Sequence, residues 1–342
     1  MKVFYSEAHS GHDPKGFISA GRLAENPEVP ERAERLLQAV QDAGHQVLAP
    51  AAHGPGPLAQ VHTLDYLDFL EHGHGIWSRV AGASPEIIPN AHPGRHMRTR
   101  PDHIIGLAGY HMADTACPIG AGTWDAVRAA ADCALTAADR VLGQDRVAYA
   151  LCRPPGHHAF ADMAGGFCFL NNVAIAAEHC RDQVPRVAIL DIDVHHGNGT
   201  QGIFAARGDV FFASIHADPA RFYPWFAGYA HERGVGAGLG FTLNLPQPKG
   251  AGDDAFHGAI DRALDRIARF APGVLLISLG FDAQENDPLG ILKVTTAGFR
   301  EAGGRIAGAG LPTVLIQEGG YLCPELGANL AAFLAGFEAA AA

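Results

Sequence analysis

Continuous runs of apolar residues, rich in β-branched side chains, recur along the 342-residue chain. Runs of about four to eight such residues are typical of strands that are buried on both faces of a sheet. The pattern predicts eight strands, at residues 2–7, 46–50, 147–154, 186–194, 210–217, 241–246, 273–282 and 313–320.

Amphipathic patterns lie between several of these runs. Apolar residues spaced by three and four positions predict helices over residues 122–143 and 253–270. Residues 30–44 begin with proline and end with glycine, which favours a third helix there. Strands that alternate with helices predict an α/β fold with a central, mainly parallel eight-stranded sheet, covered by helices on both faces.

One segment lacks this alternation. Residues 73–121 are rich in glycine, proline and histidine and show little periodicity. A loop of this length inside a compact domain is usually functional or an interaction element. No internal repeat or low-complexity linker divides the chain, so we predict a single domain over residues 1–342 with a long functional loop insertion at about 73–121.

Composition and charge narrow the classes of partner. Hydrophobic residues make up 48% of the chain and charged residues 18%, as in globular proteins. The formal net charge of −11 disfavours nucleic acid and anionic membranes as partners. No apolar run resembles a secretory signal or a membrane span, and the six cysteines form no CxxC pair. We therefore expect a cytoplasmic protein with reduced thiols.

Four of the predicted strands end in, or are followed directly by, residues with acidic, imidazole or phenol side chains. Because the carboxyl ends of parallel strands meet at one edge of an open α/β sheet, where ligands bind, we expect these groups to gather there. In chain order they are His157, His158, Asp191, Asp193, His195, His196, Asp282, Glu318 and Tyr321.

The aspartates of the 186–194 run indicate a metal site. Strand alternation places Asp191 and Asp193 on one side of the strand, and His195 follows directly. Two carboxylates and one imidazole form a three-ligand site for a divalent ion, with an open position for water. A single strand-end aspartate would fit a helix N-cap better, but four converging strands favour a metal site because buried carboxylates need partners.

The tandem histidines and a tyrosine complete a candidate reaction centre. His157 and His158 lie on a proline-stiffened turn close to glycines that let a substrate approach the backbone. One imidazole can deprotonate water while the other holds charge or serves the leaving group, and Tyr321 can hydrogen-bond a carbonyl oxygen as it becomes anionic. The assembled chemistry is metal-assisted amide hydrolysis. Neither a G-x-S-x-G elbow nor a GxxxxGK[ST] loop is present.

Five motifs carry a family resemblance over nearly the whole chain. They are "RPPGHHA", "GGFCFLNN", "DIDVHHGNGT", "SLGFDAQENDPLG" and "EGGY". They resemble the histone deacetylase superfamily, within the arginase–deacetylase fold, and are most similar to bacterial acetylpolyamine amidohydrolases and histone-deacetylase-like amidohydrolases. The resemblance implies a metal-dependent hydrolase that acts on linear amides.

The resemblance also implies the ligands of the divalent ion. Asp193, His195 and Asp282 would hold one zinc ion per chain. Ligand sets of this kind also accept Fe²⁺ or Co²⁺, and metal availability decides between them.

The same resemblance assigns the catalytic roles. His158 would be the general base, His157 its electrostatic partner oriented by Asp191, and Tyr321 the group that polarises the carbonyl. Many relatives carry an aspartate behind the base where this chain has Asn198. An amide orients an imidazole without adding negative charge, so we expect His158 to keep a low pKa and to stay neutral near pH 7.

Two structural sites for K⁺ or Na⁺ are implied as well. The inner site would use Asp191, Asp193, His195, Ser214 and Ile215, and the outer site would use Phe204, Val210 and Phe241.

A substrate tunnel is expected beside the metal, and its lining bears on the choice of substrate. Phe167 and Tyr223 would wall the tunnel, with Gly166 and Leu289 nearby. Relatives usually carry an acidic residue where this chain has Ala116.

The loop that contains this position bears on substrate charge and on assembly. Asp114 is close in sequence but displaced from the acidic position, so we expect weakened recognition of cationic amines. The 73–121 loop would narrow the entrance and support a homodimer or a higher homo-oligomer.

The sequence thus predicts a zinc-dependent amidohydrolase for a small N-acyl substrate, with acetylpolyamines as the default. Acetyl-lysine or a neutral or xenobiotic small amide would need the same chemistry. Arginase-like ureohydrolysis would need a second metal, and a non-catalytic binder of acylated ligands would not need Tyr321. Neither of these two alternatives fits the motifs as well.

Overall fold

The computed structural model describes residues 1–143 and 145–341, and a single eight-stranded sheet forms its centre. All neighbouring strands in it are parallel, in the order β4-β1-β5-β10-β9-β6-β7-β8. The eight predicted strands and the α/β fold class are confirmed. The strands are β1 (Lys2–Phe4), β4 (Gln46–Leu48), β5 (Val147–Ala150), β6 (Val187–Asp191), β7 (Val210–Ala217), β8 (Thr242–Gln247), β9 (Val274–Leu279) and β10 (Thr313–Gln317).

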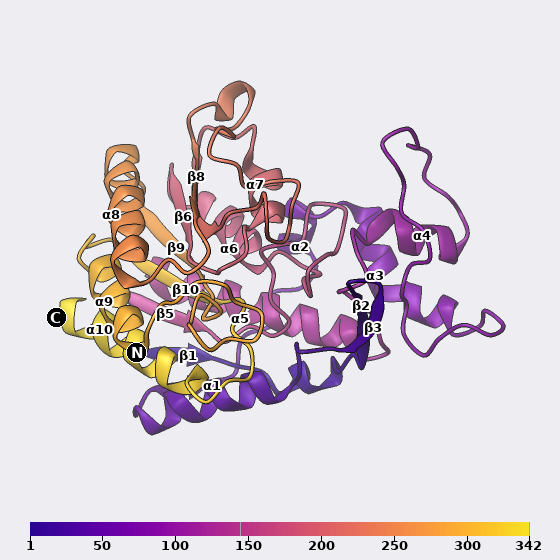
Figure 1. The fold of residues 1–342 in the computed structure, drawn as a ribbon, viewed down its shortest axis with the longest axis horizontal. Coiled ribbons are helices and arrows are strands. Elements are labelled where there is room, and N and C mark those ends of the chain that lie inside the picture. The colour runs from indigo at the N-terminus through magenta and orange to yellow at the C-terminus, as the bar shows by residue number, and fades with distance from the viewer. Residues whose placement is uncertain (144, 342) are drawn as a thin grey trace.

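Helices cover both faces of the sheet (Figure 1). Buried side chains alternate along each strand, so that Ile189 packs into one core cluster and its neighbour Leu190 into the other. One face is covered by α1 (Glu31–Asp42), α8 (Asp253–Phe270), α9 (Thr296–Ala307) and α10 (Leu326–Ala341). The other is covered by α5 (Thr123–Gly143), α6 (Asn172–Arg181) and α7 (Asn198–Phe204), and the same core cluster also includes residues of α2 (Gly56–Val61), α3 (Leu64–Trp77) and α4 (Ile104–His111).

The three predicted helices are present, with bounds that shift by two residues at most. The strands at 147–154 and 273–282 are shorter than predicted, because their apolar runs continue into buried loops that leave the sheet. A small antiparallel hairpin of β2 (Gly16–Ser19) and β3 (Arg22–Glu25) was not predicted, since its residues lack an apolar run.

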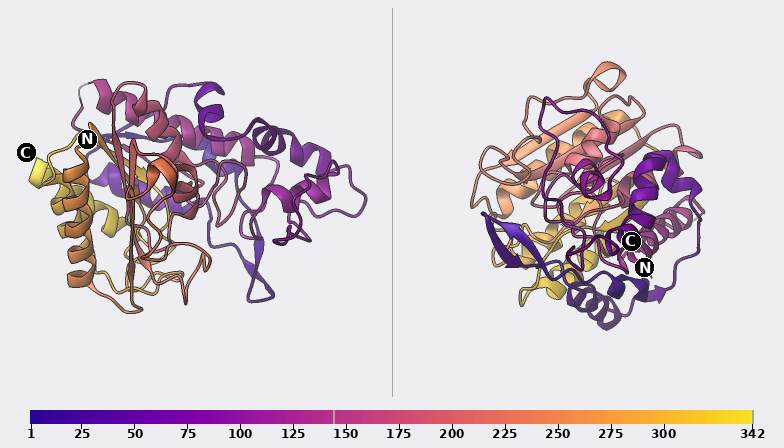
Figure 2. Two further views of the ribbon diagram at one scale, coloured as in Figure 1. Left: turned by 90° about the horizontal axis from the view of Figure 1, so that it is seen from above. Right: turned by 90° about the vertical axis from the view of Figure 1, so that its right-hand side faces the viewer.

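The 73–121 segment is more ordered than the loop that the sequence predicts. It contains the end of α3 and all of α4, and a β-bridge joins Ile87 to Ile119. Figures 1 and 2 show this part of the chain at the opposite end of the molecule from the two termini. Among the described residues, no helix combines the length and the apolar character needed to cross a membrane.

The strand order determines where the chemistry lies. Strands β5, β10, β9 and β6 are direct neighbours in the sheet, and all four run parallel. These are the four strands whose carboxyl ends carry the predicted polar groups, so the sheet brings those groups to one edge.

Candidate active site

Asp193, His195 and Asp282 converge at the carboxyl edge of the sheet. His195 Nδ1 lies 3.1 Å from Asp193 Oδ1 and 3.2 Å from Asp282 Oδ2. One ligand atom of each residue lies within 4.8 Å of the other two, and all three side chains are buried. The predicted metal ligands therefore come together from the ends of β6 and β9.

Backbone amides aim these carboxylates at one point. Gly319 N–H donates to Asp193 Oδ2 at 2.8 Å, and Val194 N–H donates to Asp282 Oδ1 at 2.7 Å. Asp193 Oδ1 also accepts a hydrogen bond from His195 N–H at 2.9 Å, and Asp193 Oδ1 and Asp282 Oδ2 both face His195 Nδ1. A set of two carboxylate oxygens and one imidazole nitrogen, oriented by outer hydrogen bonds, suits a catalytic zinc ion.

The charges at this point also call for a cation. Burial, together with the charge of Asp193, raises the pKa of Asp282 to about 7. Although burial opposes it, hydrogen bonds and charge from both aspartates raise the pKa of His195 to about 9. Two fully buried carboxylates so close together are costly unless a positive charge lies between them, and a divalent ion would supply it.

The tandem histidines lie beside these ligands. His157 Nδ1 donates to Asp191 Oδ2 at 3.1 Å, and its Nε2 lies 3.8 Å from Asp193 Oδ1. Asn198 Oδ1 accepts a hydrogen bond from His158 Nδ1 at 2.7 Å, so that His158 Nε2 is left as the acceptor. The rings of His157 and His158 are 4.1 Å apart.

The two imidazoles differ in charge. Burial lowers the pKa of His157, but the charges of Asp193 and Asp191 outweigh it and raise the pKa to about 10. Burial lowers the pKa of His158 well below its usual value, and the positive charge of His157 lowers it further. At neutral pH one ring is therefore positive and the other is neutral, as expected for a general base beside an electrostatic partner.

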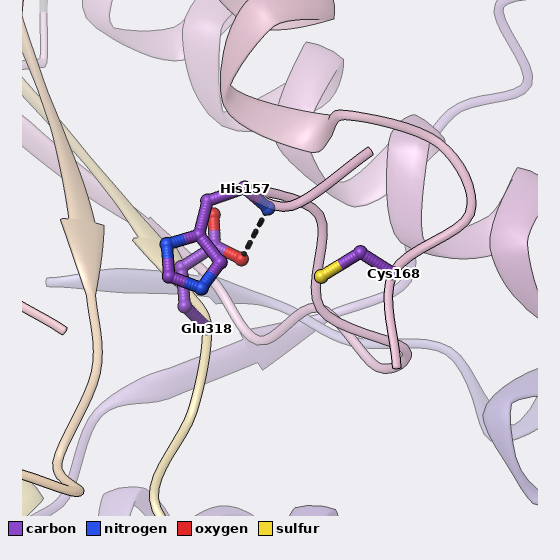
Figure 3. A group of neighbouring side chains, drawn as sticks. All are labelled: His157, Cys168 and Glu318. Atoms are coloured by element: carbon purple, nitrogen blue, oxygen red, sulfur yellow. Dashed lines mark hydrogen bonds between the residues drawn. The ribbon is translucent and has the colours of Figure 1, made fainter. Parts of the chain in front are cut away.

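A buried glutamate fixes the turn that carries these histidines (Figure 3). Glu318 Oε2 accepts hydrogen bonds from Gly156 N–H at 2.6 Å and His157 N–H at 3.0 Å, and Ser278 Oγ donates to its Oε1 at 3.2 Å. His157, Cys168 and Glu318 also lie close enough together to resemble a metal cluster. Because the glutamate oxygens and His157 Nδ1 already have hydrogen-bond partners, we assign this group to the support of the turn.

Tyr321 follows two glycines after β10, as predicted. Its ring stacks edge-on against Phe167 at 5.8 Å, and the guanidinium of Arg32 lies 4.7 Å from the ring centre. Burial raises the pKa of Tyr321 well above its usual value, while Arg32 opposes the shift. The hydroxyl therefore stays protonated and can donate a hydrogen bond.

Aromatic side chains surround the reaction centre. The ring of Tyr223 meets His158 edge-on at 5.0 Å, and Phe222 stacks on His195 at 5.0 Å. Phe17 of the β2–β3 hairpin packs edge-on against Phe167 at 5.6 Å. Of the predicted tunnel residues, Tyr223 thus lies beside His158, and Phe167 lies beside Tyr321. Phe17 and Phe222 were not predicted.

Gly166 and Leu289 were also predicted to lie near the tunnel. Gly166 and Phe167 adopt positive φ angles of 51° and 67°, and a Cβ at Gly166 would lie 2.5 Å from the ring of His158. Leu289 is half-buried, and its N–H is bound by Asp287.

The 73–121 loop brings one acidic side chain to this region, that of Asp114, which the sequence predicts to be displaced from the acidic position. Asp114 Oδ2 accepts hydrogen bonds from Tyr223 Oη at 2.7 Å and Gly166 N–H at 3.1 Å. Its Oδ1 accepts from Ala116 N–H at 2.8 Å. The turn at 114–116 directs the aspartate toward Gly166 and Tyr223, so the acidic group comes from position 114, although the motif pointed to Ala116.

The proposed inner cation residues lie together. Asp191 pairs in register with Ser214 across β6 and β7, and Ser214 Oγ lies 2.9 Å from His216 Nδ1. The outer set is more dispersed, with residues at the end of α7, at the start of β7 and just before β8. In that set, the Phe204 and Phe241 carbonyls accept backbone hydrogen bonds from Arg207 and Phe212.

Several supporting residues escaped the sequence analysis. Arg32 could have been identified from the sequence. It lies on the same face of its helix as Leu36 and Val40, and a charged residue on an apolar face is a signal of a buried role. Asp287 stands in a quoted motif, five residues after Asp282. Phe17 and Phe222 carry no signal of their own, since only the folded chain brings them to the site.

The chain is similar to several known proteins. Residues 26–337 match the histone deacetylase domain. The chain is 46% identical to an acetylpolyamine amidohydrolase of Burkholderia pseudomallei over 99% of each sequence. It is 43% identical to that of Mycoplana ramosa over 98% of this chain and 99% of the relative. A crystal structure of acetylpolyamine aminohydrolase from Burkholderia pseudomallei matches the fold with a TM-score of 0.96 at 45% identity, covering 99% of both chains.

Proposed function

The chain belongs to the histone deacetylase family, and on this basis we propose that it is a zinc-dependent amidohydrolase that removes the acetyl group from a small N-acetylated amine. One observation carries the proposal: the ligand atoms of Asp193, His195 and Asp282 face one another beside a neutral His158. A zinc ion held by these three side chains would polarise the acetyl carbonyl and make water nucleophilic at neutral pH.

The residues of the chain perform the proton transfers. His158 Nε2 accepts a proton from the attacking water, because Asn198 holds the Nδ1 proton and burial keeps the ring neutral. The protonated ring then delivers that proton to the nitrogen of the departing amine. Positive His157 stabilises the negative charge that develops between the two steps.

Tyr321 acts on the acetyl group of the substrate. Its protonated hydroxyl donates to the carbonyl oxygen as negative charge builds there. The Arg32 guanidinium against the ring, and the Phe167 ring beside it, hold the phenol in place.

A cationic amine is the favoured substrate class. The Asp114 carboxylate touches two tunnel residues, and among the described residues no basic side chain lies within 4.0 Å of it. Its negative charge is therefore free to attract an ammonium group. The curated relatives at 46% and 43% identity are acetylpolyamine amidohydrolases, so we propose acetylpolyamines as substrates.

Two finer assignments accompany this proposal. We propose that K⁺ or Na⁺ occupies the inner set around Asp191 and Ser214, with the outer set as a second site. We also propose that the chain forms one catalytic domain and that the 73–121 segment joins copies of it into a homodimer, which sedimentation velocity would test.

The function is tested by acetate release. Protein stripped with a chelator and reloaded with one equivalent of Zn²⁺ is given acetylputrescine, an acetyl-lysine peptide and N-butylacetamide. We expect the zinc-loaded protein to hydrolyse acetylputrescine best and the stripped protein to hydrolyse none of the three. Hydrolysis by the stripped protein, or no hydrolysis after reloading, would refute the proposal.

A further inference from the structure

A buried carboxylate lies behind Tyr321, and the proton transfers described above do not use it. Asp287 is 6% exposed and stands in the loop that follows β9. Its Oδ2 accepts a hydrogen bond from Tyr321 N–H at 2.7 Å, and its Oδ1 accepts one from Leu289 N–H at 2.8 Å. No Lys, Arg or His among the described residues lies within 4.0 Å of this carboxylate, so the two amides are its principal partners.

The segment before Tyr321 is constrained on its other sides. Gly320 has a φ of 111°, and a Cβ there would lie 2.9 Å from the Cβ of Phe281. Arg32 Nε donates to the Gly320 carbonyl at 2.5 Å, and Gly319 N–H is bound to a metal ligand. Asp287 supplies the side-chain acceptor for the amide of Tyr321 itself.

We propose that Asp287 is the positioning residue that sets where the Tyr321 hydroxyl lies. Its carboxylate binds the amide of Leu289 in the loop after β9 and the amide of Tyr321 in the loop after β10. It therefore links the two loops and fixes the backbone that carries the phenol. A misplacement of a reacting group by about 1 Å costs on the order of a hundredfold in rate, so this anchor bears directly on turnover. The inference rests on the proposed function, since it concerns the polarisation of the carbonyl by Tyr321.

The test is a double-mutant cycle of Asp287→Asn and Tyr321→Phe, with acetylputrescine as the substrate. Asparagine keeps one acceptor oxygen and turns an NH₂ group toward the other amide. We expect Asp287→Asn to lower kcat about tenfold, with KM changed less than about twofold, when Tyr321 is present. In the Tyr321→Phe background it should lower kcat less than about twofold, because the hydroxyl that it positions is already gone.

A second measurement does not depend on activity. Hydrogen exchange at the Tyr321 amide should be faster in Asp287→Asn than in the wild type, because a single uncharged acceptor oxygen must then serve two amides. The matched control is Asp253→Asn. Asp253 likewise accepts two hydrogen bonds, from Thr295 N–H at 2.8 Å and Thr295 Oγ1 at 2.7 Å, but at the start of α8. This control should leave kcat and the exchange of the Tyr321 amide unchanged.

The outcomes separate this inference from the proposed function. An equal loss of kcat in both backgrounds, or an unchanged Tyr321 amide, would overturn the positioning role. If Asp287→Asn does not fold, Asp287→Glu replaces it in the same cycle, since it keeps both acceptor oxygens and shifts them by one methylene. If the zinc-loaded wild type releases no acetate, the proposed function fails, while the exchange experiment still decides whether Asp287 anchors the amide.

Discussion

At the scale of single residues, neighbours give chemically similar side chains different roles. His157 and His158 are adjacent, yet one lies against Asp191 and is positive, while the other lies against Asn198 and is neutral. The motifs predicted both partners. They did not predict that burial would be the main cause of the low pKa of His158, since the depth of a side chain depends on the whole fold.

A substitution of Asn198 should therefore change the pH dependence of kcat/KM. Replacing it by aspartate puts a negative charge against His158 Nδ1, which raises the pKa of the ring. Because the base must be neutral, the acid limb of kcat/KM should move to higher pH in Asn198→Asp, so that activity falls more at pH 6 than at pH 8. The pH–rate profile measures this, and an unmoved acid limb would contradict the role of His158.

In the proposed mechanism, the phenol of Tyr321 acts only once negative charge develops on the carbonyl oxygen. Tyr321→Phe should lower kcat by about 10²- to 10³-fold, the usual effect of losing one such donor. Zinc content should stay at the wild-type level, because the tyrosine is not a ligand. Atomic absorption and acetate release check both points, and unchanged turnover would show that the hydroxyl has no part in the reaction.

Asp114 should set the preference for charge in the substrate. In Asp114→Asn the ratio of kcat/KM for acetylputrescine to that for N-butylacetamide should fall about tenfold, which corresponds to about 1.4 kcal/mol. Asp42→Asn, at an exposed position on α1, is the control and should keep the wild-type ratio. If Asp114→Asn keeps it too, recognition of the ammonium group lies elsewhere.

At the scale of elements, prediction succeeded where hydrophobic pattern decides the outcome and failed where tertiary contacts do. The run at 210–217 and the pattern at 253–270 match β7 and α8 to the residue. Helix α4 and the β2–β3 hairpin lack such patterns and are stabilised by packing and by mutual pairing. The direction of the Asp114 carboxylate could not be predicted for the same reason, since it depends on the turn at 114–116.

The contact between His62 and the start of helix α6 should weaken at acid pH. His62, between α2 and α3, is buried, and its Nε2 accepts a hydrogen bond from the N–H of Asn171, the N-cap of α6. Burial lowers the pKa of His62 to about 4, below the value of about 6.5 expected in the unfolded chain. As the pH falls, His62 is therefore protonated in the unfolded chain before it is protonated in the folded protein. The stability that neutral His62 contributes is lost as the pH falls from about 6.5 to about 4.

His62→Gln should reduce this acid sensitivity. Glutamine offers an acceptor oxygen that does not titrate. Between pH 6.5 and 4, the free energy of unfolding of His62→Gln should therefore fall by about 3 kcal/mol less than that of the wild type. Urea unfolding at a series of pH values measures it, with His72→Gln at an exposed position of α3 as the control. A pH dependence as steep as that of the wild type would contradict the assignment.

At the scale of the whole molecule, the parallel sheet turns distant segments of sequence into one site. The proposed ligands and reacting groups, from residues 157 to 321, meet because β5, β10, β9 and β6 are neighbours. The sequence predicted that edge, since its polar residues follow the strands directly. It could not predict the strand order or the three-sided support of Tyr321, which depend on how the connections cross the sheet.

The proposed function depends on one zinc ion held by Asp193, His195 and Asp282. Crystals of the active protein, measured on both sides of the zinc absorption edge, test it most directly. We expect one strong anomalous peak per chain, about 2.0–2.2 Å from Asp193 Oδ1, His195 Nδ1 and Asp282 Oδ2. The absence of a peak between these three atoms, in crystals of protein that still releases acetate, would contradict the account.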